Sequence, residues 1–487
     1  MSKLKKTENI FILILVAFFI PFFIYFKPLQ SNDENHAFQR VYGISQGLFI
    51  VKNHPLPVSE ADISHFGFIP NEPNSLFPKS VAEFVESYPG LENYNDSFGK
   101  WVKTPLNKNE RILLGTTQFD TYAPVAFLPQ ALAVTLGKLF NSSPVILDYL
   151  ARFAVFITYA LFMYFSIKII PVKKWAVAAV GLLPIMISLS IGMNADIMSI
   201  GPIVLFLAIL LRSYFEERSK KENVLDILIL SLLVTIAALS KPSMIAVIVL
   251  IPLYFVDYQK IKYVKKLGLK SLTWLKMIAT VAPLIIYGAW TSLTSTHHLG
   301  LSDIYLTAIP QLSRLKTAPL AAIKSFMTGA WNYLKTGLGL LQSPFTDTNG
   351  SLDSLKFNDY VFHLPYLFGY LTLISIFVFI FVGYQEKKEK LSAVSEMRLR
   401  LLSVFMVVAV LGIVAATWLA QWITWTPVDS DRILGIQARY YMAVFFILAV
   451  IPTGRLFCTT EKIYKVYSIS SLLILLSASS IALALAP

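Results

Sequence analysis

The sequence has very little cysteine. Cys458 is its single thiol, so an intrachain disulfide is excluded, and so is a zinc or iron–sulfur site built from several cysteines. The chain also lacks the glycine-rich loop that holds nucleotide phosphates. A nucleotide-linked substrate, such as a nucleotide sugar, is therefore not expected.

The sequence also has few charged residues. Only 15% of the 487 residues are charged, against roughly 25% in an ordinary soluble domain. By contrast, 55% of the residues are hydrophobic and the mean hydropathy is +0.61. A soluble fold could not bury so much apolar surface, and a disordered chain would be far more polar. The composition predicts an all-α polytopic membrane protein.

Apolar runs close to the roughly 20 residues that cross a bilayer predict about eleven transmembrane helices in a single membrane domain over residues 1–487. The basic N-terminus leads into the first run with no small-residue cleavage site after it, so we interpret that run as an uncleaved span. The predicted spans are 8–27, 147–170, 174–192, 195–212, 224–240, 242–258, 274–292, 361–384, 400–420, 439–454 and 464–485.

Lysine and arginine gather in every second loop, for example at Lys173-Lys174 and at Lys387-Lys388. The positive-inside rule then places the N-terminus in the cytoplasm and the C-terminus outside. The formal net charge of +13 follows from these loops and does not indicate a nucleic-acid partner.

Two large segments, 28–146 and 293–360, are then extracytoplasmic. Each contains an amphipathic stretch, 125–140 in the first and 308–341 in the second, with apolar residues at helical spacing and few charges. These stretches are expected to lie along the outer leaflet of the lipid bilayer. In the first segment, Ser80–Glu83 has the pattern of a capping box that opens a short helix.

Acidic and basic side chains cluster just after the first span. If Asn32 or Asp33 caps a helix, then Asp33, His36 and Arg40 share one of its faces. An acid, an imidazole and a guanidinium together suit proton transfer beside an anionic group. The alternative is an ordinary cap and a solvated helix with Glu34 in its first turn. A divalent metal with Asp33 and His36 as ligands is a further alternative, but two ligands are too few to indicate one, so no cofactor is expected.

Three cations stand at predicted outer helix ends, against the positive-inside bias. They are Arg152, Lys241 and Arg439, and together they are suited to bind a lipid phosphate. For any one of them, snorkelling to lipid headgroups is the simpler interpretation. Asp196 begins a span on the same side, either as a helix cap or facing the same cavity as Asp33. Tyr122 lies in a proline-rich turn and is either structural or in contact with substrate.

The stretch from Asn32 to Gly47 resembles the opening motif of a bacterial membrane-protein family, Domain of Unknown Function 2142, in which Pro-Asp-Glu precedes His, Arg, Ala and Tyr. Asn32 replaces the usual Pro and Val41 the usual Ala. Blocks at 122–130 and 184–212 also resemble the family.

A last block, 435–452, is similar to the family's Gly-x-Gln-Gly-Arg-Tyr-Phe motif. Here Gln437 and Arg439 keep the motif, and Ala438 replaces its second Gly.

The family's layout is similar to that of GT-C type integral-membrane glycosyltransferases. The resemblance implies transfer of a sugar from a polyprenyl-phosphate donor to a glycan or lipid-linked acceptor, on the outer face of a bacterial cytoplasmic membrane. Other glycan-assembly proteins are candidate partners. The catalytic candidates are Asp33 and Glu34, and the substrate-binding candidates are His36, Arg40, Tyr122, Arg152, Asp196, Lys241, Gln437 and Arg439.

The alternatives are a polysaccharide polymerase or ligase, a transporter or flippase of a lipid-linked saccharide, and a non-catalytic scaffold. A transporter is expected to carry ionisable residues in mid-membrane. The predicted spans contain almost none, which favours chemistry at the membrane surface.

Overall fold

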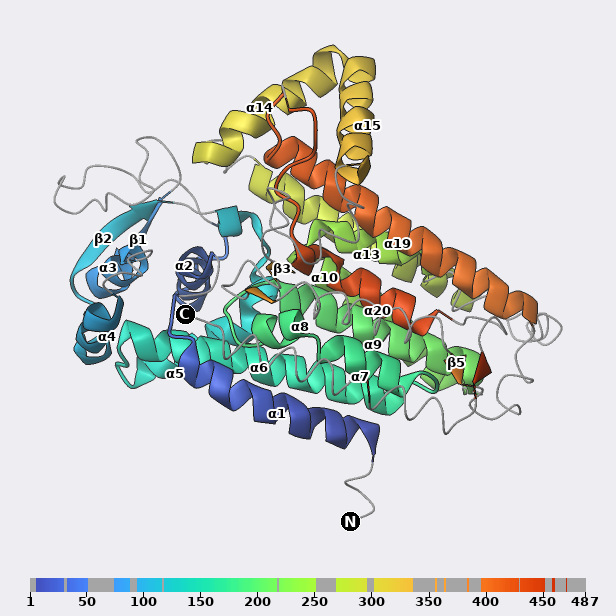
Figure 1. The fold of residues 1–487 in the computed structure, drawn as a ribbon, viewed down its shortest axis with the longest axis horizontal. Helices are drawn as coiled ribbons and strands as arrows, with labels where there is room; N and C mark the ends of the chain where they lie inside the picture. Colours follow the sequence, from blue (N-terminus) through green and yellow to red (C-terminus); the bar gives the residue numbers. More distant parts are fainter. Residues whose placement is uncertain are drawn as a thin grey trace.

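The computed structural model describes residues 6–29, 33–50, 74–87, 94–115, 118–216, 219–250, 269–295, 302–335, 396–428 and 430–451, with 355–356, 363–364, 383–384, 458–459 and 470. The described chain is mostly helical, and its long helices run in one general direction (Figure 1).

In the described part of the chain, six helices are long and apolar enough to cross a membrane, which confirms a polytopic helical protein. Because α9 packs against α6, α10 and the shorter helix α20, it forms the centre of the main hydrophobic core. The six helices are α1 (Thr7–Tyr25), α6 (Pro144–Ile169), α9 (Asp196–Phe215), α10 (Lys220–Ser240), α13 (Leu269–Ser295) and α19 (Glu396–Thr424).

The count of eleven spans is not confirmed. The predicted span 174–192 is two short helices, α7 (Lys174–Gly181) and α8 (Pro184–Leu189). Pro184 begins α8 and its predecessor is extended, with ψ of 140°, because proline removes a backbone donor and disfavours a helical conformation before it.

Two other predicted spans are not single α-helices in their described parts. Span 242–258 begins as a 3₁₀ helix, η6 (Pro242–Leu250). Span 439–454 is a turn of 3₁₀ helix, η7 (Ala438–Tyr441), followed by the nine-residue α20 (Met442–Val450), too short to cross a bilayer by itself. The predicted spans 361–384 and 464–485 fall almost entirely outside the described residues.

The first large segment folds at one end of the bundle around a second core. Its elements are α2 (Glu34–Ser45), β1 (Asn74–Pro78), α3 (Lys79–Glu86), α4 (Tyr94–Lys103), β2 (Arg111–Gly115), η4 (Gln118–Thr121), η5 (Pro124–Phe127) and α5 (Leu128–Leu139). Strands β1 and β2 pair antiparallel, with Leu76 opposite Leu113. An all-α prediction does not include this small sheet. The other strands are two-residue pairs, β3 (Leu355–Lys356) with β4 (His363–Leu364) and β5 (Gly383–Tyr384) with β6 (Cys458–Thr459).

The capping box predicted at Ser80–Glu83 is wrong, although the helix is present. Helix α3 starts at Lys79, directly after strand β1, and Pro78 at its N-cap makes no side-chain bond. The Ser80 hydroxyl instead accepts a hydrogen bond from the Asn107 backbone N–H at 3.3 Å. The strand therefore sets where this helix begins.

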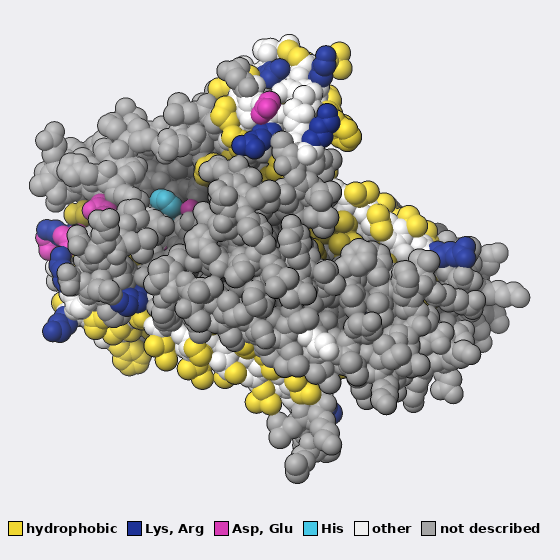
Figure 2. Space-filling view, viewed as in Figure 1, with side chains coloured by type: hydrophobic (Ala, Val, Ile, Leu, Met, Phe, Trp, Pro, Cys, Tyr) yellow, Lys and Arg dark blue, Asp and Glu magenta, His cyan; other side chains and the backbone are white. Residues whose placement is uncertain are grey.

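Both amphipathic stretches are helical in their described residues, and both expose apolar faces. Helix α5 exposes Leu132 and Leu136 among others, and hydrophobic side chains cover the edge where α1 and α5 lie (Figure 2). The second stretch divides before Pro319 into α14 (Ser302–Thr317) and α15 (Pro319–Lys335). Helix α15 exposes a stripe of Leu320, Ile323, Met327 and Trp331, and such faces suit helices in contact with lipid.

The orientation in the membrane makes a testable prediction. Asn109 is exposed in the first large segment, and Arg400 is exposed near the start of α19. The chain directly after the other end of α19 bonds to α14, where Gln311 donates to the Thr426 carbonyl. In a Cys458→Ser background, Asn109→Cys is expected to react with an impermeant thiol reagent on intact cells, whereas Arg400→Cys reacts only after permeabilisation. Labelling of Arg400→Cys in intact cells would reverse the orientation.

Candidate functional site

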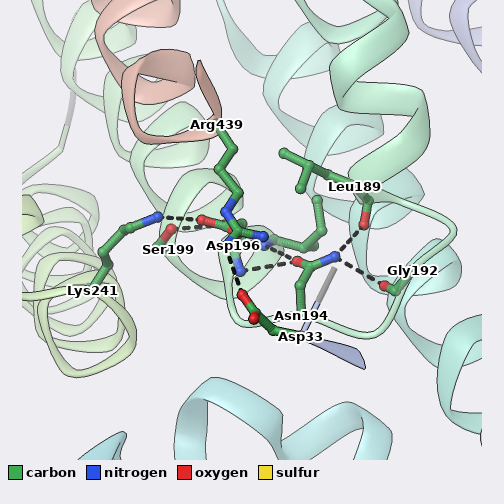
Figure 3. Close-up of polar contacts among 9 residues, drawn as sticks. Asp33, Leu189, Gly192, Asn194, Asp196, Ser199, Lys241 and Arg439 are labelled. Carbon is green, nitrogen blue, oxygen red and sulfur yellow. Dashed lines mark hydrogen bonds and ion pairs between the residues drawn. The ribbon is translucent and has the colours of Figure 1, made fainter. Parts of the chain in front are cut away.

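Four charged residues from four parts of the chain meet at the bundle end that carries the first large segment (Figure 3). Asp33 precedes α2, and Asp196 is the first residue of α9. Lys241 follows α10, and Arg439 lies in η7. The structure thus brings together four sequence-predicted site residues separated by up to 406 positions.

Arg439 lies between the two carboxylates. Its Nη2 donates to Asp33 Oδ2 at 3.2 Å, and its Nε lies 3.7 Å from Asp196 Oδ2. The other oxygen of Asp196, Oδ1, accepts a hydrogen bond from the Lys241 ammonium. With two carboxylates and two cations, the cluster is formally neutral. The Asp33 side chain is 30% exposed, whereas those of Asp196 and Arg439 are each 8% exposed.

Asn194 fixes the position of Asp196. Its Oδ1 accepts the backbone N–H groups of Asp196 and Ile197, at 3.0 and 3.3 Å, as an asparagine before a helix commonly does. Its Nδ2 donates to the carbonyls of Leu189 and Gly192. The Gln130 amide donates to the Asn194 carbonyl at 2.9 Å. The pattern Asn-x-Asp at a helix start was visible in the sequence, but a positioning role for Asn194 was not predicted.

Asp33 does not act as the side-chain cap that its place before α2 suggested. Its backbone is left-handed, with φ of 58° and ψ of 13°, and its side chain makes no cap bond. Aspartate and asparagine adopt this conformation more readily than most residues. The carboxylate is consequently turned toward Arg439 and away from the helix terminus.

A pocket of about 370 Å³, counted with its open mouth, adjoins this cluster. Phe119, Tyr122 and Tyr440 give it aromatic walls, and Asp196, Lys241 and Arg439 give it charge. The Lys241 ammonium lies 4.0 Å from the centre of the Tyr440 ring, a cation–π distance.

Tyr122 stays a neutral phenol in this pocket. Burial, reinforced by Asp196, raises the pKa of Tyr122 to about 12. Its backbone is held by Arg40, whose guanidinium donates to the carbonyls of Leu48, Phe49 and Tyr122. The neighbouring turn is tied to α13, because Trp290 Nε1 donates to the Thr121 carbonyl at 2.9 Å.

Arg40 itself is away from the pocket. Its side chain is fully buried, with Nη1 3.8 Å from Asp120 Oδ1, and it does not line the pocket. Arg40 therefore supports the turn that carries Tyr122. Such a buried position does not suit the substrate contact predicted for it. Burial lowers the pKa of the His36 imidazole, and the Asp33 carboxylate partly opposes that shift. The charge of Asp33 thus acts on His36, in agreement with the helical spacing that predicted the two to be neighbours.

Glu34 and Arg152 are wholly buried as a pair and do not line the pocket. Glu34 Oε1 accepts the Met193 backbone N–H at 3.0 Å and lies 3.6 Å from Arg152 Nε. Arg152 donates to the carbonyls of Ile191 and Phe26. These contacts join α1, α2, α6 and the turn before α9, so a positioning role suits Glu34 and Arg152 better than the catalytic and phosphate-binding roles predicted for them.

Gln437 was predicted as a site residue, whereas Asp148 was not. Gln437 is half-buried before η7 and does not line the pocket. Asp148, one turn before Arg152 on α6, is fully buried but was not predicted as part of this region. In the described part of the chain, no group of three or more His, Cys, Asp or Glu side chains is placed to hold a metal ion.

Comparison with known proteins gives one match. Residues 10–448 match the family model described as "Predicted membrane protein (DUF2142)", which covers all four residues of the ion-pair cluster. No curated protein and no solved structure matches the chain significantly. Since the match extends over most of the chain, the protein belongs to the predicted membrane protein family DUF2142.

Proposed function

We propose that the protein is a membrane glycosyltransferase that moves a sugar from a polyprenyl-phosphate donor to a cell-envelope glycan or lipid-linked acceptor, at the outer face of a bacterial cytoplasmic membrane. The observation that carries the proposal is the pocket lined by Arg439 and Lys241, next to which the partly exposed carboxylate of Asp33 pairs with Arg439. Asp33 does not line the pocket itself. A phosphate leaving group needs the cations, and an attacking hydroxyl needs the base.

In the proposed reaction, the acceptor hydroxyl attacks the anomeric carbon of the donor sugar. A new carbon–oxygen bond forms while the bond from that carbon to the phosphate oxygen breaks, and its electron pair stays on the phosphate. The hydroxyl proton passes to Asp33. The phosphate group goes from one negative charge to two, and Arg439 and Lys241 stabilise that growing charge.

The aromatic walls are suited to the sugar. Flat faces such as those of Tyr440 and Phe119 pack against apolar patches, and a sugar ring offers such patches on its C–H faces. The neutral Tyr122 phenol, with its raised pKa, can donate a hydrogen bond to a sugar hydroxyl. Glu34 and Arg152 are positioning residues in this proposal, because they hold the start of α2 and the turn before α9.

Transport of a lipid-linked saccharide is the alternative from another class. Translocation pathways generally carry ionisable residues in mid-membrane. Among the described spans, the pairs Lys241–Asp196 and Arg212–Asp226 lie toward opposite helix ends. The Glu34–Arg152 pair lies further along α6, where it joins this helix to the first large segment. This distribution favours transfer at the surface over transport.

Arg439→Ala tests the phosphate role. The variant is expected to lose activity by about 10- to 150-fold, because a charge-assisted hydrogen bond contributes about 1.5–3 kcal/mol. Arg439→Lys should recover part of the loss, since lysine keeps the charge but not the planar fork.

The measurement is the glycan product of cells carrying each variant, normalised to protein level. Arg432→Ala, the same charge change seven positions away, is the matched control and should retain activity. Full activity in Arg439→Ala would remove the phosphate assignment.

A further inference from the structure

The ion-pair cluster is balanced without any substrate. Arg439 and Lys241 are offset by Asp33 and Asp196. A donor phosphate that binds at Arg439 therefore has to compete with a carboxylate already in place, because adding an anion to a balanced, mostly buried cluster leaves an uncompensated charge.

Of the two carboxylates, Asp196 is the more firmly held. It pairs with both Lys241 and Arg439, its side chain is 8% exposed, and Asn194 fixes its backbone. It also begins helix α9, where a negative charge is stabilised by the helix dipole. Displacing Asp196 would disturb several contacts at once.

Asp33 is held less firmly. Within the cluster, its side chain accepts the 3.2 Å bond from Arg439, and that side chain is 30% exposed. Partly exposed ion pairs contribute little and exchange readily with solvent ions. The carboxylate that an anion would displace from Arg439 is therefore that of Asp33.

We propose that Arg439 acts as a latch on Asp33: the donor phosphate takes the place of the Asp33 carboxylate on Arg439, and the released carboxylate then serves as the base. This inference rests on the proposed function. At Arg439 the exchange is neutral in charge, since a phosphodiester with one negative charge replaces one carboxylate. The released carboxylate keeps its charge at a side chain that is 30% exposed to solvent. No covalent bond changes in the exchange.

The latch gives an order of events. While the pair is intact, Arg439 occupies a lone pair of Asp33 Oδ2, and an acceptor proton must compete for that oxygen. Once the phosphate is bound, Asp33 can accept the proton. The released carboxylate is thus available to take the acceptor proton while the donor is bound, as the hydroxyl attacks the anomeric carbon.

The test is a binding experiment that requires no transfer. The probe is farnesyl phosphate, which carries a phosphate monoester on a prenyl chain like the proposed leaving group, titrated into the full-length protein in detergent micelles. Asp33→Asn is expected to tighten binding by about 3- to 10-fold, because the competing carboxylate is gone. Asparagine also suits the left-handed backbone at this position.

Two controls separate the latch from a general change in charge. Glu110→Gln removes one carboxylate from an exposed surface pair with Lys79 in the same segment and should leave the affinity unchanged. In an Arg439→Ala background, Asp33→Asn should no longer tighten binding, because the residue for which the two anions compete is absent. Unchanged or weaker binding in Asp33→Asn overturns the latch, and so does tightening that persists without Arg439.

Two other ligands identify what is bound. Farnesol has the prenyl chain without the phosphate and should bind no more tightly to Asp33→Asn than to the wild type. Inorganic phosphate should bind more weakly than farnesyl phosphate but show the same tightening. Equal affinity for the two phosphates would point to free phosphate, keeping the latch and overturning the lipid donor. Absence of phosphate binding in every variant would overturn both proposals.

Discussion

Asp33→Asn is expected to reduce sugar transfer by about 10²- to 10⁴-fold, the usual contribution of a general base. The amide keeps the size of the carboxylate and can still accept a hydrogen bond from Arg439, but it cannot take the proton of the acceptor hydroxyl. The variant should fold and insert normally, because the side chain is 30% exposed and asparagine tolerates the left-handed backbone of Asp33. The measurement is the glycan product of cells, with a blot for protein level.

Asp33→Glu should also be poor. The extra methylene moves the carboxylate by about 1 Å, and misplacement on that scale can cost about 10²-fold. Glu110→Gln, an exposed charge removal in the same segment, should retain wild-type activity. A normal glycan in the Asp33→Asn strain would rule out the catalytic assignment and leave the transporter or scaffold interpretation ahead.

The effects of Asp33→Asn on sugar transfer and on phosphate binding together distinguish a chemical role of Asp33 from a structural one. If Asp33 is both base and competitor, Asp33→Asn binds the phosphate more tightly and transfers sugar more slowly. A residue that merely stabilised the fold would lower binding and transfer together. The opposite signs of the two effects therefore distinguish a chemical role from a structural one.

The meeting of Asp33, Asp196, Lys241 and Arg439 was predictable in outline from the sequence. Each stands at a helix end on the same predicted side of the membrane, and a cation such as Lys241 in a short outer loop departs from the usual bias. Patterns of neighbouring residues in the sequence do not, however, predict the distances between side chains that are far apart along the chain. The 3.2 Å contact between residues 33 and 439 depends on how the helices between them pack.

Burial was the least predictable property. Glu34 sits beside Asp33 in the sequence, yet it is fully buried against Arg152 while Asp33 is partly exposed. Successive residues at the start of a helix point about 100° apart, so neighbours in the sequence can have opposite surroundings. The same limit applies to Arg40, whose helical spacing predicted its face but not its three backbone carbonyl partners.

Local rules also failed where tertiary contacts override them. Ser80 and Glu83 have the right spacing for a capping box, but β1 runs directly into α3 and leaves Pro78 at the cap. Pro184 divides a run that is apolar enough for a span into α7 and α8. Helix α8 ends at Leu189, and Asn194 in the following turn and Asp196 at the start of α9 both line the pocket.

Arg152→Ala is expected to be the most destabilising of the proposed substitutions, by about 3–5 kcal/mol, the range for breaking a buried ion pair. The guanidinium is fully buried beside Glu34 and donates to the carbonyls of Phe26 and Ile191. It also packs over the Phe23 ring, with 5.3 Å to the ring centre. Its removal would leave Glu34 as a buried charge without its cation. The measurement is the free energy of unfolding in mixed micelles with increasing SDS.

Arg212→Ala at the opposite end of the bundle is the matched control for Arg152→Ala. Arg212 also pairs with a buried carboxylate, Asp226, at 2.9 Å, but its side chain is 20% exposed, so water can reach the site and the loss should be smaller. Adding Glu34→Gln to Arg152→Ala should recover part of the stability, because the uncompensated charge is then removed. If Arg152→Ala unfolds like the wild type while farnesyl phosphate binding falls, Arg152 belongs to the phosphate site after all, as its place in the sequence suggested.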